Sequence, residues 1–349
     1  MQITLTELHK RLLNDFQRDF PLTPSPYRAL AGHLGVDEAA VLAAFAELDR
    51  QQLVSRIGAI IPPNHIGAST LVAMAIPPGQ LQAVADRISA FPEVNHNYER
   101  ENRFNLWFVA AASSAKQLQT VLAAIEQATG FAALRLPLVD DFFIDLGFQL
   151  EFCQSSTLPP TVSLSNPLAV SLSNPPVARQ TQYKPDTQDL ALLAQIADGL
   201  PLCPRPYAQL GLQISMDEVE VIHRLTVLKA QGLIKRLGVI VKHRPLGYRA
   251  NAMVVWDVPD AQVKQLGGQI SQFNFVTLCY QRPRHAEWPY NLYCMIHGKN
   301  RATVLAQLAQ LSQACGLGEF ARQVLFSRRC FKQRGAVYQA PPTSVTANG

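Results

Sequence analysis

The sequence predicts an α+β protein built from two tandem copies of one unit, a winged helix-turn-helix followed by a ferredoxin-like βαββαβ module. Three observations support this fold class: an internal repeat, the same order of helical and strand patterns in both halves, and a Ser/Pro-rich stretch between them. The predicted boundaries are 1–152 for the first unit, 153–186 for an extended linker, 187–340 for the second unit and 341–349 for a disordered tail.

The repeat is visible as matching segments in a constant register. Residues 21–30, PLTPSPYRAL, match residues 201–210, PLCPRPYAQL, and in the same register LVSRIG at 53–58 matches LIKRLG at 233–238. This many identities in one register indicate a duplicated unit.

Each unit begins with three predicted helices and a β-wing. The first helix shows apolar residues at helical spacing, and the third starts at Asp37 or Asp217, an acidic residue favoured at a helix N-terminus. Two short strands, around 56–58 and 236–238, are expected to follow. Three helices and a wing are typical of a winged helix-turn-helix.

The remainder of each unit alternates as strand, helix, strand, strand, helix, strand. This order predicts a four-stranded antiparallel sheet with both helices on one face, and the two sheets are expected to pair face to face or edge to edge. The strands are predicted near 69–76, 93–100, 104–112, 132–143, 249–257, 274–282, 290–297 and 319–334, and the helices near 79–91, 115–129, 260–271 and 300–314.

Composition describes an ordinary globular protein. Of 349 residues, 48% are hydrophobic and 16% charged, and the net charge of +5 permits an anionic partner without requiring one. The six cysteines form no C-x-x-C pair, so neither a zinc ribbon nor a thioredoxin-like motif is expected, and the thiols are expected to be reduced. No apolar run reaches the roughly 18 residues of a membrane span. We therefore expect a cytoplasmic protein without a metal site.

The most distinctive stretch is 276–297, VTLCYQRPRHAEWPYNLYCMIH, which places arginine, histidine and aromatic residues between two apolar strands. A shorter version, VNHNYERENRFNLWF, occupies 94–108 in the first unit. Guanidinium, imidazole and phenol groups beside apolar aromatics suit a flat ligand that carries carboxylates. A solvated hairpin tip is the alternative.

DNA binding is a competing hypothesis, because the third helix of a winged helix-turn-helix usually reads the major groove. Here residues 37–52 carry four acids and one base, and residues 217–231 carry three acids against one arginine and one lysine. Phosphate repels acidic helices. We therefore interpret both helices as a packing scaffold.

The winged helix followed by a ferredoxin-like module resembles the Lrp/AsnC regulators. The segments HNYERENRFNLWF at 96–108, CYQRPRHAEWPYNLYCMIHG at 279–298 and KRLGVIVKHRPLGYRANAMVVWD at 235–257 resemble the two subunits of siroheme decarboxylase, here fused in one chain. The resemblance implies a carboxy-lyase that removes the C12 and C18 acetate carboxyl groups of siroheme to give 12,18-didecarboxysiroheme, in haem d1 or alternative haem biosynthesis. A DNA-binding regulator and a tetrapyrrole sensor remain as alternatives.

Siroheme would then be a substrate and not a prosthetic group, with no added cofactor. The expected partners are siroheme and its product, without DNA or membrane; a homodimer, other decarboxylase subunits and the next pathway enzyme are left open. The candidate substrate-binding residues are Arg56, Arg100, Arg103, Trp107, Arg236, Arg282, Arg284, Trp288 and Tyr290, and the candidate catalytic residues are His96, Tyr98, His243, Tyr280 and His285.

The chemistry of these side chains fits a polycarboxylate that loses carbon dioxide. Guanidinium groups bind carboxylates, and histidine can donate the proton that the new carbanion needs. Trp107 fits a core position better than a ligand wall, and His297 is expected to bond the backbone and not to act in catalysis. Because the second unit has the denser cluster, we expect one half to supply most active groups.

Overall fold

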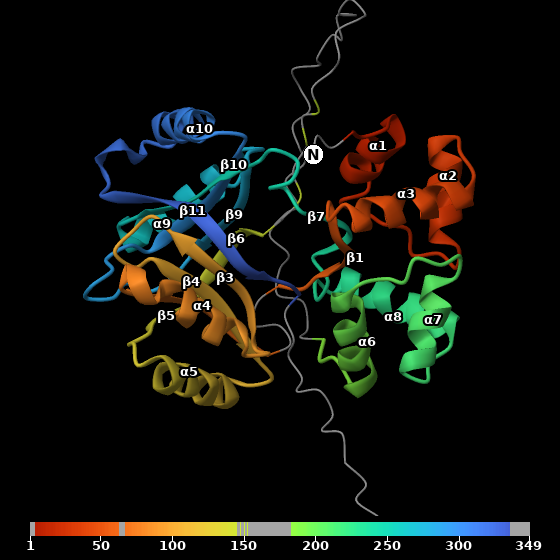
Figure 1. Cartoon of the computed structure of the whole chain (residues 1–349), viewed down its shortest axis with the longest axis horizontal. Coiled ribbons are helices and arrows are strands. Elements are labelled where there is room, and N and C mark those ends of the chain that lie inside the picture. The colour runs from red at the N-terminus through yellow and green to blue at the C-terminus, as the bar shows by residue number, and fades with distance from the viewer. Residues whose placement is uncertain are drawn as a thin grey trace, which may run out of the picture.

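The computed structural model describes residues 4–62, 67–144, 147, 150, 152 and 183–335. The predicted linker as far as residue 182 and the predicted tail lie outside the described residues. The molecule has two parts, a sheet flanked by helices and a group of helices around a short ribbon of two strands (Figure 1).

The helical part contains the two predicted winged helix-turn-helix units around one shared core. Its helices are α1 (Glu7–Asp15), α2 (Pro26–Leu34) and α3 (Glu38–Arg50) from the first half, and α6 (Thr187–Asp198), α7 (Pro206–Gln213) and α8 (Glu218–Ala230) from the second.

The two units hold each other through symmetrical contacts. The Tyr27 hydroxyl donates to the Pro201 carbonyl at 3.0 Å, and the Tyr207 hydroxyl donates to the Pro21 carbonyl at 2.8 Å. The third helices start as predicted, since the Asp37 carboxylate caps α3 and the equivalent aspartate of the second half caps α8.

The wing differs from the one expected for each half alone. Strand β1 (Val54–Ile60) pairs with strand β7 (Arg236–Val241), so one ribbon joins both halves, with Gly58 opposite Gly238. Position 238 requires glycine because a Cβ there would lie 2.1 Å from the backbone oxygen of Gln17. The close approach of α1 to the ribbon fixes the helices against it.

The ferredoxin-like modules are confirmed in both halves. The first contains β2 (Ala68–Met74), α4 (Leu81–Ser89), β3 (Val94–Arg100), β4 (Leu106–Ala112), α5 (Ala115–Thr129) and β5 (Leu134–Pro137); the second contains β8 (Ala250–Trp256), α9 (Asp260–Ile270), β9 (Val276–Gln281), β10 (Leu292–Gly298), α10 (Arg301–Ala314) and β11 (Arg322–Gln333). Short 3₁₀ turns occupy Pro78–Gln80 and Leu317–Glu319. The strand orders β5-β2-β4-β3 and β11-β8-β10-β9 are equivalent, and the pairs are antiparallel.

The last strand of each half crosses to the other half. The first part of β11 pairs with β8 of its own sheet, and its continuation from Ser327 pairs with β3 of the first half. In the same way, β6 (Asp140–Ile144) follows β5 and pairs with β9 of the second half. In the described part of the chain, nine strands therefore form one continuous sheet, the predicted edge-to-edge pairing.

The two modules also share a core on the sheet faces that look away from their helices. Its members come from both halves and include Trp107, Leu136, Met253, Tyr293 and Leu325. Separate cores lie under α4 and α5 and under α9 and α10. The shared inner core means that face-to-face packing accompanies the edge-to-edge pairing.

The five cysteines among the described residues are free thiols. Within the same residues, no single helix has the length and apolar character of a membrane span. One pair, α2 and α3, reaches that length and apolar character when the two helices are taken together, but they are bent by 101° relative to each other.

Candidate functional site

The duplicated fold brings part of the predicted residues together in two places, each where the β1/β7 ribbon meets one of the modules. The first, the Arg282 cavity, contains Arg56, His96, Tyr280, Arg282 and Arg334. The second, the histidine cluster, consists of His243, His297, Arg100 and Arg236. Both contain groups from both halves of the chain.

The alternation of a β-strand explains how β3 supplies both places. Asn97 donates to the Ala85 carbonyl of α4 at 3.0 Å, so it points toward the helices. Its neighbours His96 and Tyr98, and then Arg100, point to the opposite face because successive side chains alternate. The equivalent alternation on β9 brings Tyr280 to the same inner face of the sheet.

The two imidazoles of the histidine cluster lie side by side. The ring centroids of His243 and His297 are 5.7 Å apart, and Nδ1 of His297 is 3.0 Å from Oδ1 of Asn251, which is directly opposite on β8. Burial, followed by the charges of His297 and Arg236, lowers the pKa of His243 to about 3. Burial and the charge of Arg100 lower the pKa of His297 to about 4. Both rings are therefore neutral at neutral pH.

Two buried arginines flank these rings. Arg236 is 5% exposed and Arg100 is 7% exposed. Arg100 donates to the Leu325 carbonyl at 3.3 Å and to the Ser327 hydroxyl at 3.0 Å, and its guanidinium lies 5.6 Å from the centre of the Tyr98 ring. Within the described residues no carboxylate pairs with Arg100, so its charge is available to an anion.

Tyr98 is a poor candidate for the proton donor. Its hydroxyl donates to Oε1 of Gln333 at 3.1 Å, and burial raises the pKa of Tyr98 above its usual value. Tyr280 directs its hydroxyl to the sulfur of Met253 at 3.9 Å, inside the shared core. The imidazoles are therefore the better candidates for proton transfer.

A large cleft borders the histidine cluster at His297. It has a volume of about 800 Å³ and is lined by α1, by the end of β10 with His297, and by the start of α10. Lys10 and Arg11 line it on α1, where they pair with Glu7 and Asp15 at 3.2 Å each, and these two carboxylates line it as well. Lys299 lines it near the start of α10. The ammonium group of Lys299 lies 5.8 Å from the ring centre of Tyr248, another lining residue. The entrance therefore carries charges of both signs, with three cations and two carboxylates.

The arginines and the histidine of the two hairpins have hydrogen-bond or ion-pair partners within the chain. Arg284 donates to Asp257 at 2.8 Å and to Asp260 at 2.6 Å, and Arg103 forms an ion pair with Glu287. His285 is exposed and accepts a hydrogen bond from the Glu287 amide at 3.2 Å. These contacts occupy the side chains, so we leave Arg103, Arg284 and His285 out of the proposed site.

The hairpin aromatics build the shared core. Trp107 is 1% exposed and Trp288 is 3% exposed, with ring centroids 5.3 Å apart. Trp288 donates to the Tyr293 hydroxyl at 2.9 Å, and Tyr290 packs edge-on against it. Trp107 therefore occupies the core, as its strand pattern favoured, and the other two belong to the same cluster.

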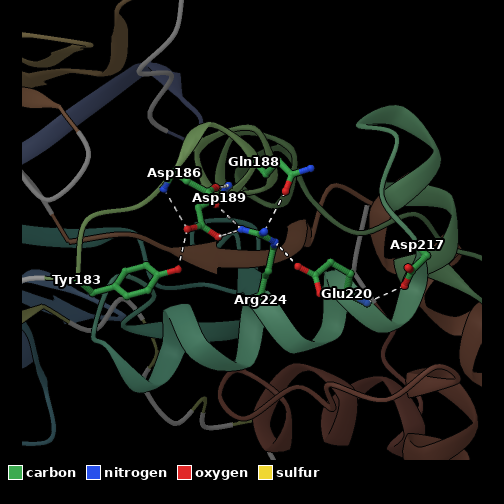
Figure 2. A network of polar contacts seen from close by, with 7 residues as sticks. All are labelled: Tyr183, Asp186, Gln188, Asp189, Asp217, Glu220 and Arg224. Atoms are coloured by element: carbon green, nitrogen blue, oxygen red, sulfur yellow. Dashed lines mark hydrogen bonds and ion pairs between the residues drawn. The ribbon is translucent and has the colours of Figure 1, made fainter.

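The third helix of the second half is engaged in an internal ion-pair network. Arg224 of α8 contacts Asp186, Asp189 and Glu220 and also bonds Gln188, as Figure 2 shows. Asp189 is 1% exposed and also accepts a hydrogen bond from the Tyr183 hydroxyl at 2.8 Å. Arg224 is thus used to hold α8 against the start of α6, which fits the predicted role of this helix as a scaffold.

Residues that the sequence reasoning missed include His297, Asn251 and Lys299. His297 bonds the Asn251 side chain and packs on His243. A signal existed, because His297 and Asn251 are polar residues in two strands that are otherwise largely apolar. Among the described residues, no group of three or more His, Cys, Asp and Glu side chains could hold a metal ion.

Comparison with known families assigns both parts of each half. The AsnC-like ligand binding domain matches residues 66–142 and 245–332, and the siroheme decarboxylase NirDL-like HTH domain matches residues 9–54 and 189–235. Each of these models matches twice, which agrees with the duplicated sequence and fold.

Similar proteins cover nearly the whole chain. The siroheme decarboxylase NirDL subunit of Paracoccus denitrificans is 43% identical over 337 residues, 96% of this chain and 98% of that protein. The siroheme decarboxylase of Hydrogenobacter thermophilus is 30% identical over 329 residues, 93% of this chain and 92% of that protein. A crystal structure of siroheme decarboxylase NirDL in co-complex with an iron-uroporphyrin III analogue matches at a TM-score of 0.65, with 25% identity and coverage of 95% and 94% of the two chains.

Proposed function

This chain belongs to the siroheme decarboxylase family, and we propose that its reaction takes place at the histidine cluster. The reaction removes the carboxyl groups of the C12 and C18 acetate side chains of siroheme and gives 12,18-didecarboxysiroheme. The observation that carries this site is the pair of neutral imidazoles, His243 and His297, beside a cleft of about 800 Å³.

Size favours this site over the Arg282 cavity. Pockets that enclose a drug-sized ligand measure roughly 300–1,000 Å³. The cleft falls near the top of that range, whereas the Arg282 cavity, at about 210 Å³, falls below it. Only the cleft has room for most of a tetrapyrrole ring.

The buried charges beside the imidazoles are compatible with a carboxylate substrate at the same site. Siroheme carries several carboxylates, and a guanidinium group binds a carboxylate through two parallel hydrogen bonds. Arg100 and Arg236 lie beside the imidazoles, and Lys299 lines the cleft next to His297. The other two lining cations, Lys10 and Arg11, pair with Glu7 and Asp15 of the same helix. We infer that the inner arginines orient the reacting acetate and that Lys299 holds another acid side chain.

The chemical step requires a proton donor next to the reacting carbon. The bond between the methylene carbon and the carboxylate breaks, carbon dioxide leaves, and the electron pair remains on the methylene carbon in conjugation with the macrocycle. An imidazolium then donates its proton to that carbon, which becomes a methyl group, and the histidine regains a proton from water.

The free protein holds His243 and His297 in their neutral forms because burial and adjacent arginines lower the pKa of each. An incoming carboxylate raises the pKa of a nearby imidazole, since it favours the charged form. Substrate binding would therefore prepare the donor, and the free protein would not hold a buried imidazolium.

The site draws on both halves, with Arg100 from the first and Arg236, His243 and His297 from the second. In Stutzerimonas stutzeri the corresponding relatives are a separate NirD subunit and a separate NirL subunit, 48% and 45% identical to parts of this chain. We propose that the fused chain forms a complete site without a second subunit. Siroheme is the substrate, and the proposed chemistry uses no additional cofactor.

Anaerobic incubation of the purified chain with siroheme, followed by mass spectrometry of the tetrapyrrole, tests this function. We expect the mass to fall by two carbon dioxide units. Loss of one unit would contradict a site that completes both reactions. An unchanged mass with a shifted absorption band would indicate a tetrapyrrole-binding protein and overturn the assignment of an enzyme.

A further inference from the structure

The Arg282 cavity is not used by the reaction proposed above, yet it has the chemistry of an anion site. It lies between β1 of the ribbon, the first module and the end of β9, with a volume of about 210 Å³. Three arginines line it, Arg56, Arg282 and Arg334, and none of its lining residues is an aspartate or a glutamate.

Arg282 is the most deeply buried of these cations. It is 8% exposed, and its guanidinium lies 4.6 Å from the centre of the Tyr280 ring and donates to the Leu136 carbonyl. Its Nε is buried without a hydrogen-bond partner among the described residues. A buried guanidinium with neutral partners leaves charge uncompensated, which an anion would stabilise.

Arg56 and Arg334 add to the same excess of positive charge. Nε of each is buried and has no partner among the described residues. The carboxylate of Asp198 acts on Arg56 from a distance, and no ion pair joins the two within the described residues. Arg334 donates to the Pro92 carbonyl, which is also neutral.

The duplicated fold gives this cavity a counterpart, the histidine cluster. In the repeat Arg56 matches Arg236. Arg282 matches Arg100, because each lies two residues after a tyrosine at the end of the equivalent strands β9 and β3, so both places keep the cationic groups. The residue that matches His297 is Ala111, since Ala111 of β4 lies opposite Ser69 of β2 as His297 of β10 lies opposite Asn251 of β8. His96, which has no copy in the second half, is the imidazole of this cavity, and burial with the charge of Arg56 lowers its pKa to about 4.

We propose that the Arg282 cavity is a second carboxylate-binding site, separate from the histidine cluster. Its volume admits a small free carboxylate or a single acid-bearing edge of a tetrapyrrole, and its apolar walls, which include Leu71, Val109 and Leu278, suit the hydrocarbon part of either ligand. The proposal depends on the geometry of this cavity and not on the reaction assigned to the histidine cluster.

Binding to the double variant Arg56→Gln/Arg282→Gln tests the proposal. Iron-uroporphyrin III is titrated anaerobically by absorption to count the equivalents bound per chain, and citrate is titrated separately while the thermal unfolding midpoint is measured. Arg103→Gln serves as the matched control, because that arginine is exposed and pairs with Glu287 outside both sites. Thermal unfolding without ligand checks that each variant is folded.

Two results would support the site and identify the source of the carboxylate. If it takes a tetrapyrrole edge, the wild-type chain and the control bind two equivalents of iron-uroporphyrin III and the double variant binds one. If the cavity takes a free carboxylate, wild type, control and double variant each bind one equivalent of iron-uroporphyrin III. Citrate then raises the unfolding midpoint of wild type and control, and the affinity for citrate falls at least about tenfold in the double variant. One equivalent throughout, with the same citrate response in the double variant, would overturn the proposal.

Discussion

The buried histidines predict that this protein loses stability in mild acid. Burial lowers the pKa of His96 and His297 to about 4 and that of His243 to about 3, from an ordinary value of 6.5 in the unfolded chain. The histidines of the unfolded state therefore bind protons below about pH 6.5, whereas those of the folded state bind them only at about pH 4 or below. Each histidine contributes stability that is present above pH 6.5 and is lost as the pH falls toward the folded pKa.

The magnitude follows from the width of this window. Each pH unit below 6.5 removes about 1.4 kcal/mol per histidine, so a fall to about pH 5 removes about 2 kcal/mol from each. Because part of each ring is exposed, solvent screens some of this effect, and we expect about 1–2 kcal/mol per histidine. The three together then give about 3–6 kcal/mol, a large part of the stability of a typical domain.

Urea unfolding at about pH 7.5 and about pH 5 measures this loss for the wild type and for His243→Asn and His96→Asn. The quantity compared is the difference in free energy of unfolding between the two pH values, so packing changes that affect both values equally cancel. Each variant is expected to lose about 1–2 kcal/mol less than wild type on acidification. The exposed His285→Asn variant is the matched control. Variants with the wild-type pH dependence would refute the reasoning.

Two further predictions concern the packing around the site. Gly238→Ala is expected to lower the free energy of unfolding by about 1–3 kcal/mol, because its Cβ would lie 2.1 Å from a backbone oxygen, whereas Gly268→Ala, with open space around it, should show no such loss in urea unfolding. Arg224→Met is expected to cost about 2–4 kcal/mol in the same assay, because it leaves the buried carboxylate of Asp189 without its cation. Arg50→Met removes a more exposed arginine from its pair with Glu47 and should cost less than about 1 kcal/mol. Equal effects within either pair would contradict the packing argument.

The sequence predicted the modules well, because their local patterns are strong. The helix expected at 115–129 is α5 with the same limits, and the strand expected at 93–100 starts one residue later as β3. The repeat gave the architecture of both halves from one set of patterns. Amphipathic spacing and helix caps depend on residues that are close together in the chain, so they can be recognised from the sequence alone.

The exchange between the halves could not be predicted in the same way. Alternating apolar residues show that β1 and β7 are strands, but they do not show which strand lies beside each. The long predicted strand at 319–334 left open that its two parts pair with different sheets. The partners depend on contacts between distant segments.

The site was predicted in part. The repeat pointed to Arg56 and Arg236, which the structure brings to equivalent positions on the ribbon. The density of charges in the hairpin at 282–290 predicts a binding site there, yet Arg284 pairs with carboxylates that are distant in sequence. The sequence predicts a backbone bond for His297. Its packing on His243 depends on tertiary structure and could not be predicted from the local pattern.

Single-turnover decarboxylation of siroheme by His243→Asn and His297→Asn, compared with His285→Asn, tests the central claim most directly. The three substitutions are identical, and only the first two remove an imidazole of the histidine cluster. We expect the rate of carbon dioxide loss to fall by about 100-fold or more in each of the first two and to remain near wild type in the third. Wild-type rates in both cluster variants would contradict the assignment of the reaction to this site.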